Sequence, residues 1–266
     1  MSKVAQRIAE INNCNRKVLS IFLTAGFPEK SKTIELASLI YDNGADIIEL
    51  GMPFSDPLAD GPVIQKASFQ ALQNGVTMKY IMDTARTIKD KYPSKSLLLM
   101  GYANPILSYG IKKFYADCLE AGVDGLIVPD IPLEEFDSFY GDVFKDLDKI
   151  LLTTPVSSES RILEIDQKSG GFVYCVSILG TTGARDIFDE TTLINLQRTR
   201  DILKKNKMMI GFGISNAASV KKFSPYCDGV IVGSAVIKSI EADYNNQNMN
   251  WDETVKLIKE LFEATK

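Results

Sequence analysis

The chain has 266 residues, of which 45% are hydrophobic and none is histidine, and 30 basic against 34 acidic side chains give a formal net charge of −4. This length and hydrophobic content fit one large core, and the acidic balance argues against a nucleic-acid-binding protein, which usually carries a basic excess. Without histidine, acid–base chemistry near neutral pH falls to carboxylates, tyrosines, lysines or cysteines.

The four cysteines are widely spaced and form no CxxC motif: Cys14, Cys118, Cys175 and Cys227. With no histidine beside them they predict no metal site, and they are too few for a disulfide scaffold. Free thiols are typical of a reducing compartment. The first residues contain no apolar run typical of a signal peptide, and no segment approaches membrane-spanning length. We therefore expect a cytoplasmic protein.

Short apolar runs alternate with helical patterns along the whole chain. The runs predict eight strands, apolar on both faces as in a parallel sheet covered by helices, over 19–23, 46–50, 97–101, 125–128, 149–153, 172–176, 208–211 and 229–232. Apolar periodicity between them, with glycine after several helix ends, predicts helices over 33–43, 63–74, 78–91, 111–121, 192–204, 217–223, 236–241 and 252–264.

A faint internal repeat supports a barrel. Segments 44–49, 122–128 and 226–232 each contain a small turn with aspartate followed by a buried strand. Eight strand–helix units without a break in composition predict a single (β/α)8 TIM barrel over 1–266, with additional N-terminal and inter-strand helices. An open doubly wound sheet is the rival fold, but the GxGxxG expected after its first strand is absent. The long connections 51–61 and 177–190 would lie at the carboxyl-terminal face, where barrel active sites form.

Glycines follow the last three predicted strands, in the segments GTTG at 180–183, GFG at 211–213 and GSA at 233–235. Backbone N–H groups at such glycines and at the start of a short helix can converge on a phosphate. The same glycines can also serve only as tight turns. Glycines at two adjacent strand ends, with Ser234 at a helix start, favour the phosphate interpretation.

Two carboxylates and one tyrosine are candidates for chemistry. Glu49 ends the second strand, where burial in the barrel mouth would raise its pKa, although a structural salt bridge is the alternative. Asp60 can act in the site or cap the helix that begins at Pro62. Tyr174 alternates with its neighbours onto one face of the sixth strand, toward a ligand or into the core. Asp56 is interpreted as a turn residue or a surface contact, and Asp130 as a turn or helix-start residue.

The segment ELGMPFSDPLADGPVIQ at 49–65 closely resembles the signature of the tryptophan synthase α subunit family. Other stretches agree in register, at 22–28, 100–106, 129–135, 172–177, 180–183, 211–214 and 233–235, so the resemblance covers nearly the whole chain. Three positions depart mildly from the family pattern. Met100 stands where leucine is frequent, Thr181 where valine is commoner, and Ala103 where a second aromatic is often found.

The resemblance implies cleavage of indole-3-glycerol phosphate to indole and glyceraldehyde 3-phosphate, with no cofactor on this chain. It makes Glu49 the general acid–base, Asp60 the acceptor of the indole N–H and Tyr174 a neighbour of the reacting centre. The implied substrate contacts are Phe22, Met100 and Ile127 around the indole, Phe212 near the phosphate, Gly183, Gly213, Gly233 and Ser234 at the phosphate, and Thr182 on the loop after the sixth strand, where it orients Asp60.

The family works with a β subunit that uses pyridoxal phosphate and consumes indole, in an assembly of two α and two β subunits. The implied contact surface includes Pro53, Asp56, Asn104 and Pro132. Two other functions stay open. One is another barrel enzyme acting on a phosphorylated substrate, for which a lysine at the end of the second, third or fourth strand is missing. The other is a non-catalytic activator of the β subunit, against which the intact acidic pair argues.

Overall fold

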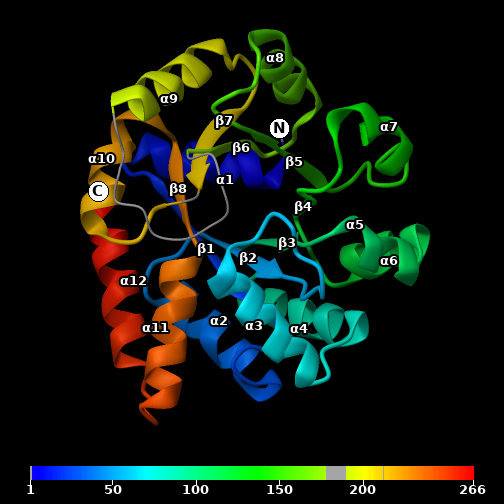
Figure 1. Ribbon diagram of the computed structural model, residues 1–266, viewed down its shortest axis with the longest axis vertical. Coiled ribbons are helices and arrows are strands. Elements are labelled where there is room, and N and C mark those ends of the chain that lie inside the picture. Colours follow the sequence, from blue (N-terminus) through cyan, green and yellow to red (C-terminus); the bar gives the residue numbers. More distant parts are fainter. Residues whose placement is uncertain (1, 178–189, 212) are drawn as a thin grey trace.

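Eight parallel strands form a closed barrel in the computed structural model, which describes residues 2–177, 190–211 and 213–266 (Figure 1). Each strand pairs with the next in chain order, and β8 pairs with β1 to close the ring. Within the described ranges the strands are β1 (Val18–Thr24), β2 (Ile47–Gly51), β3 (Ser96–Met100), β4 (Gly125–Ile127), β5 (Asp148–Thr153), β6 (Phe172–Val176), β7 (Lys207–Gly211) and β8 (Gly229–Val232). The closed order confirms the predicted barrel and excludes the open sheet.

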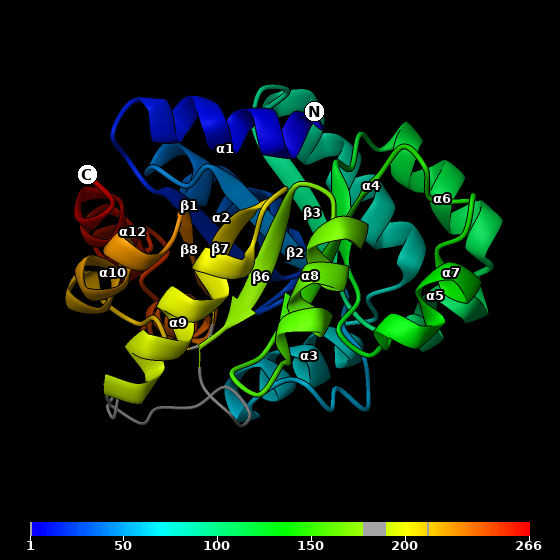
Figure 2. The ribbon, with the colours of Figure 1, turned by 90° about the horizontal axis from the view of Figure 1, so that it is seen from above.

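Helices surround the strands. In the part of the chain that the structure describes they are α1 (Lys3–Asn13), α2 (Thr33–Asp42), α3 (Pro62–Gln73), α4 (Met78–Lys91), α5 (Ala103–Tyr109), α6 (Ile111–Glu120), α7 (Phe136–Phe139), α8 (Glu159–Lys168), α9 (Glu190–Ile202), α10 (Ala217–Phe223), α11 (Ser234–Asn245) and α12 (Asp252–Ala264), with short 3-10 turns η1 (Lys30–Lys32), η2 (Leu133–Glu135) and η3 (Ser224–Tyr226). Figure 2 shows α1 lying across the amino-terminal ends of the strands. Within the same ranges, no helix has the length and apolar character that a membrane crossing requires.

All eight strands and all eight helices expected from the sequence are present, with ends that differ by a few residues. The last short helix is the largest difference, because α11 begins at Ser234 and continues to Asn245. Helices α5, α7 and α8 were not predicted. Ser158 is a sequence signal that could have predicted the start of α8, because serine is a favoured helix cap. Its hydroxyl accepts a hydrogen bond from the Arg161 N–H.

The aspartates of the internal repeat hold the amino-terminal ends of the strands together. One carboxylate oxygen of Asp46 accepts a hydrogen bond from the Leu19 N–H at 3.0 Å, across to β1. Asp124 does the same for Leu97 of β3 at 2.9 Å, and Asp228 for Met208 of β7 at 2.9 Å. Each aspartate thus fixes the start of the strand that precedes its own in the chain, which explains why the turn recurs.

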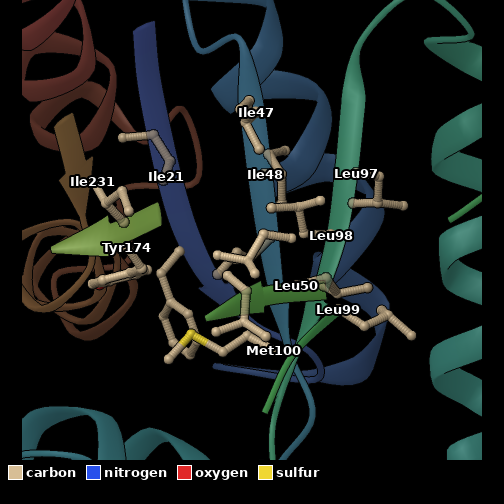
Figure 3. Packing of buried hydrophobic residues seen from close by; sticks show 14 of the residues in the cluster. Ile21, Ile47, Ile48, Leu50, Leu97, Leu98, Leu99, Met100, Tyr174 and Ile231 are labelled. Carbon is tan, nitrogen blue, oxygen red and sulfur yellow. The ribbon is translucent and has the colours of Figure 1, made fainter. Parts of the chain in front are cut away.

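Side chains alternate between the inside of the barrel and the surrounding helices, as strand geometry requires. Figure 3 shows Leu98 and Met100 on one side of β3, and Leu97 and Leu99 on the other. Glu49 is paired in register with Phe22 of β1 and Leu98 of β3, so its side chain joins the inward set. The fold therefore delivers an acidic group to the interior, close to the carboxyl-terminal rim.

Candidate active site

Glu49 lies near the end of β2 and is completely buried. Its Oε1 accepts a hydrogen bond from the Ser20 hydroxyl at 2.8 Å, whereas its Oε2 has no hydrogen-bond partner among the described residues. Burial raises the pKa of Glu49 to about 8, and the Ser20 hydrogen bond opposes this only in part. No ion pair in the described ranges involves Glu49. The side chain is thus mostly protonated at pH 7, and no ion pair among the described residues supports the salt-bridge alternative.

Asp60 lies in the loop after β2 and is half-buried. Its Oδ2 accepts a hydrogen bond from the Tyr102 hydroxyl at 3.0 Å, and the Tyr102 oxygen accepts one from the Ala59 N–H at 3.1 Å. Burial raises the pKa of Asp60 to about 6, although the Tyr102 hydrogen bond lowers it. The residue that caps α3 is Gly61, without a side-chain cap bond, so Asp60 does not serve as the helix cap.

Tyr174 points inward from β6 and is buried. Its ring lies against Gly211 of β7, where a β-carbon would come within 2.1 Å of the phenolic oxygen. Burial raises the pKa of Tyr174 well above its ordinary value, and the charges of Glu49 and Asp60 raise it further. The phenol therefore stays neutral, and both carboxyl groups interact with it electrostatically. The structure therefore brings all three sequence candidates for chemistry into one region.

An apolar wall stands beside this acidic pair. Phe22 and Met100 are almost fully buried, and the Phe22 ring covers Gly51, where a β-carbon would lie 2.4 Å from the ring. A cavity next to Asp60 is lined by Phe22, Gly51, Met52, Asp60, Ser68, Met100, Gly101, Tyr102 and Pro129. Ile127 is paired with Met100 in register but is fully buried and does not line this cavity. Two of the three predicted indole contacts thus border it.

The predicted phosphate residues are described only in part. Gly213 follows β7, is exposed and has a φ of +80°, which favours glycine. Gly233 precedes α11 and Ser234 is its first residue, so the amino terminus of a twelve-residue helix lies directly at the predicted phosphate segment. A β-carbon on Gly233 would meet the β-carbon of Phe22 at 3.4 Å. Thr182, Gly183 and Phe212 lie outside the described residues.

Two residues of the site were not singled out from the sequence. Ser20 interrupts the apolar run of β1 before its final Thr24, and this hydroxyl was the available signal. Tyr102 belongs to the family-like segment 100–106, but its contact with Asp60 joins residues 42 positions apart. Tyr102 also packs against Phe54, with ring centroids 5.4 Å apart.

The predicted partner-contact residues lie at the same end of the barrel, in the loops after β2 and β4 and at the start of α5. Asp56, Asn104 and Pro132 are exposed, whereas Pro53 is buried in the isolated chain. The Asp130 carboxylate accepts hydrogen bonds from the Ala103 N–H at 3.0 and 3.2 Å. Asp130 therefore does bind a helix start, that of α5, and it ties the loop that carries Pro132 to the helix that carries Asn104.

Comparisons with known proteins agree with the resemblance seen in the sequence. The family model described as tryptophan synthase alpha chain matches residues 8–266. The tryptophan synthase alpha chain of Petrotoga mobilis is 44% identical over 253 residues, which are 95% of each chain. That of Christiangramia forsetii is 40% identical over 263 residues, covering 98% of this chain and all of the relative.

Solved structures give the same result. The alpha chain from Legionella pneumophila superposes with a TM-score of 0.91 at 31% identity, covering 100% of this chain and 97% of that one. A structure titled tryptophan synthase from M. tuberculosis, aminoacrylate-bound form, gives a TM-score of 0.86 at 28% identity, with 100% of both chains covered.

Proposed function

The chain belongs to the tryptophan synthase alpha chain family, and on that premise we propose that Glu49 and Asp60 carry its catalytic step. The enzyme is a carbon–carbon lyase of tryptophan biosynthesis that cleaves indole-3-glycerol phosphate to indole and glyceraldehyde 3-phosphate. One observation carries the assignment of residues. Two carboxyl groups with pKa values near 8 and near 6 act on the same buried tyrosine beside an apolar wall.

Because their pKa values differ, the two carboxyl groups have different protonation states at pH 7 and therefore different catalytic roles. Glu49 is mostly protonated and can give a proton, whereas Asp60 is mostly ionised and can stabilise positive charge. Glu49 protonates the ring carbon that bears the glycerol phosphate chain. The positive charge that forms on the ring nitrogen is stabilised by Asp60, which accepts the hydrogen bond from the indole N–H.

The second half of the step returns the proton. The bond between the ring carbon and the side chain breaks, and its electron pair restores the aromatic ring. The hydroxyl on the departing carbon loses its proton to Glu49 and becomes the aldehyde carbonyl. Glu49 is then protonated again, and all atoms of the substrate are accounted for in indole and the triose phosphate.

Binding follows from the residues around the pair. Phe22 and Met100 offer flat and flexible apolar surface to the indole ring, with Ile127 beside Met100 on the adjacent strand β4. For the phosphate we propose Gly213, Gly233 and Ser234, supported by the amino terminus of α11, together with Gly183. Thr182, Phe212 and Tyr174 keep the roles that the family resemblance implies, near Asp60, the phosphate and the reacting centre.

The chemistry above needs only proton transfer and charge stabilisation, so we propose that this chain uses no cofactor or metal of its own. Its partner would be a β subunit that holds pyridoxal phosphate, in an assembly of two α and two β subunits. The exposed positions of Asp56, Asn104 and Pro132 support a contact at this end of the barrel, to which Pro53 contributes. The bonds of Asp60 to Tyr102 and of Ala103 to Asp130 offer a short route from that contact to the site.

Incubation of the purified chain with indole-3-glycerol phosphate, with detection of free indole, tests the proposal. We expect indole release by the native chain and none by Glu49→Gln, while glycerol phosphate still binds to the variant. Lys266→Gln, at the exposed carboxyl terminus, is the control for a substitution that changes charge without touching the site. Full indole release by Glu49→Gln would refute the role of Glu49, and a native chain that only stimulates a β subunit would favour the activator alternative.

A further inference from the structure

Ser20 is the residue that holds the Glu49 carboxyl group. The two side chains are both fully buried, and the Ser20 hydroxyl donates to Oε1 at 2.8 Å. Ser20 lies in register with Ile47 of β2 and Ile231 of β8, two apolar neighbours that Figure 3 shows inside the barrel. A buried hydroxyl is costly unless it is hydrogen-bonded. The bond to Glu49 therefore satisfies the buried Ser20 hydroxyl.

The bond also makes the two oxygens of Glu49 different. Oε1 accepts from Ser20, whereas Oε2 is buried and has no partner among the residues that the structure describes. A carboxylic acid carries its proton on one oxygen, and the oxygen that already accepts a hydrogen bond is the weaker site for it. The proton of neutral Glu49 therefore resides on Oε2, the oxygen that accepts no hydrogen bond from the described residues.

From this geometry we propose that Ser20 is a positioning residue, which anchors Oε1 of Glu49 so that Oε2 delivers the proton to the indole ring carbon. The inference rests on the proposed role of Glu49 and adds to it the choice of oxygen. Ser20 itself touches no reacting atom. It fixes the rotation of the carboxyl group, and orientation of this kind has large effects on the rate of a proton transfer.

The pKa of Glu49 decides the pH dependence of this arrangement. Tyr174 on β6 interacts electrostatically with Glu49 and with Asp60 from the loop after β2, and both charges raise the pKa of Tyr174. The Ser20 hydrogen bond lowers the pKa of Glu49 against the effect of burial. Removal of the hydroxyl should therefore move the alkaline limb of the rate profile upward, by about one pH unit for a hydrogen bond of ordinary strength.

The experiment compares Ser20→Thr with Ser20→Val, because these two side chains have nearly the same shape and differ by the hydroxyl. For Ser20→Val we expect kcat for indole release to fall by about tenfold, an almost unchanged KM, and an alkaline limb about one unit higher. Ser20→Thr should stay close to the native chain in all three. Ser96→Ala, which alters a buried serine at the start of β3 with no hydrogen bond to the site, is the matched control and should change none of them.

A second measurement needs no catalysis. The carboxyl carbon of Glu49 can be titrated by NMR in chains with labelled glutamate, assigned from the signal that Glu49→Gln lacks. Ser20→Ala and Ser20→Val should both raise the titration midpoint relative to the native chain and Ser20→Thr. This readout applies even where a variant is too unstable for extended kinetics.

The outcomes separate the two proposals. Equal kcat and equal alkaline limbs in Ser20→Thr and Ser20→Val, with an inactive Glu49→Gln, would overturn the positioning role and leave the proposed function intact. An active Glu49→Gln would overturn the proposed function itself. In the inactive Glu49→Gln background, Ser20→Val should have no further effect on any residual rate, and a further tenfold loss there would show that Ser20 acts independently of Glu49.

Discussion

Tyr102→Phe tests the charge state of Asp60 without changing the shape of the site. The substitution removes one oxygen, which donates to Asp60 at 3.0 Å and accepts from Ala59 at 3.1 Å. The ring and its contact with Phe54 remain. The Tyr102 hydrogen bond lowers the pKa of Asp60, and that pKa is about 6, so its loss raises the value.

The size of the effect follows from the strength of the lost bond. A hydrogen bond to a carboxylate that contributes about 1.4 kcal/mol corresponds to about one pKa unit. At pH 7 the ionised fraction of Asp60 would then fall from about 90% to about one half. Activity that needs ionised Asp60 and neutral Glu49 rises with pH through the first pKa and falls through the second. The profile of kcat/KM should be bell-shaped, with limbs near pH 6 and pH 8.

The assay is indole release from indole-3-glycerol phosphate between pH 5 and pH 9. In Tyr102→Phe the acidic limb should move up to about pH 7 and the alkaline limb should stay, so that the bell narrows. Tyr92→Phe serves as the control. Tyr92 follows the last residue of α4, and its hydroxyl donates to the Asp42 carboxylate at 2.9 Å. An acidic limb that stayed in place or moved downward in Tyr102→Phe would refute the reasoning.

Three further predictions concern single groups of the site. Asp60→Asn keeps the shape but not the charge, so kcat should fall by about 10²-fold or more, and a native-like rate in steady-state kinetics would contradict charge stabilisation. Gly211→Ala places a methyl group against the Tyr174 ring, so calorimetry should record a loss of stability of about 1–3 kcal/mol, and an unchanged Tm would mean that the ring is not held there. The pKa of Glu49 is higher in the folded chain than its ordinary value, so its contribution to stability is present at low pH and is lost as pH rises to about 8. Glu49→Gln lacks this titration, so its Tm advantage over the native chain should be larger at pH 9 than at pH 6, and a constant difference would refute the raised pKa.

The sequence predicted the barrel well because its signals are local. The runs that became β6 and β8 were placed to the residue, since each is apolar and bounded by turns. Glu49 was found for the same reason, because a carboxylate that ends an apolar strand is conspicuous. Its burial and raised pKa were also expected from the absence of a basic neighbour.

The contacts inside the site were harder to predict because they depend on geometry between distant segments. The bond from Ser20 to Glu49 requires the register of β1 against β2, which places Glu49 beside Phe22 and not beside Ser20. The bond from Tyr102 to Asp60 requires the path of the loop after β2. The helix-cap interpretation of Asp60 was wrong for that reason, since Gly61 takes the cap position.

The recurring aspartates of the strand starts have a consequence for engineering this enzyme. Asp46, Asp124 and Asp228 secure one end of the barrel, while Glu49 and Asp60, the proposed catalytic acids, stand at the other. Robustness and turnover are thus separable properties of the molecule. Stabilising substitutions at the end held by these aspartates should raise the Tm. The carboxyl-terminal rim would then stay free to be redesigned for another aromatic substrate.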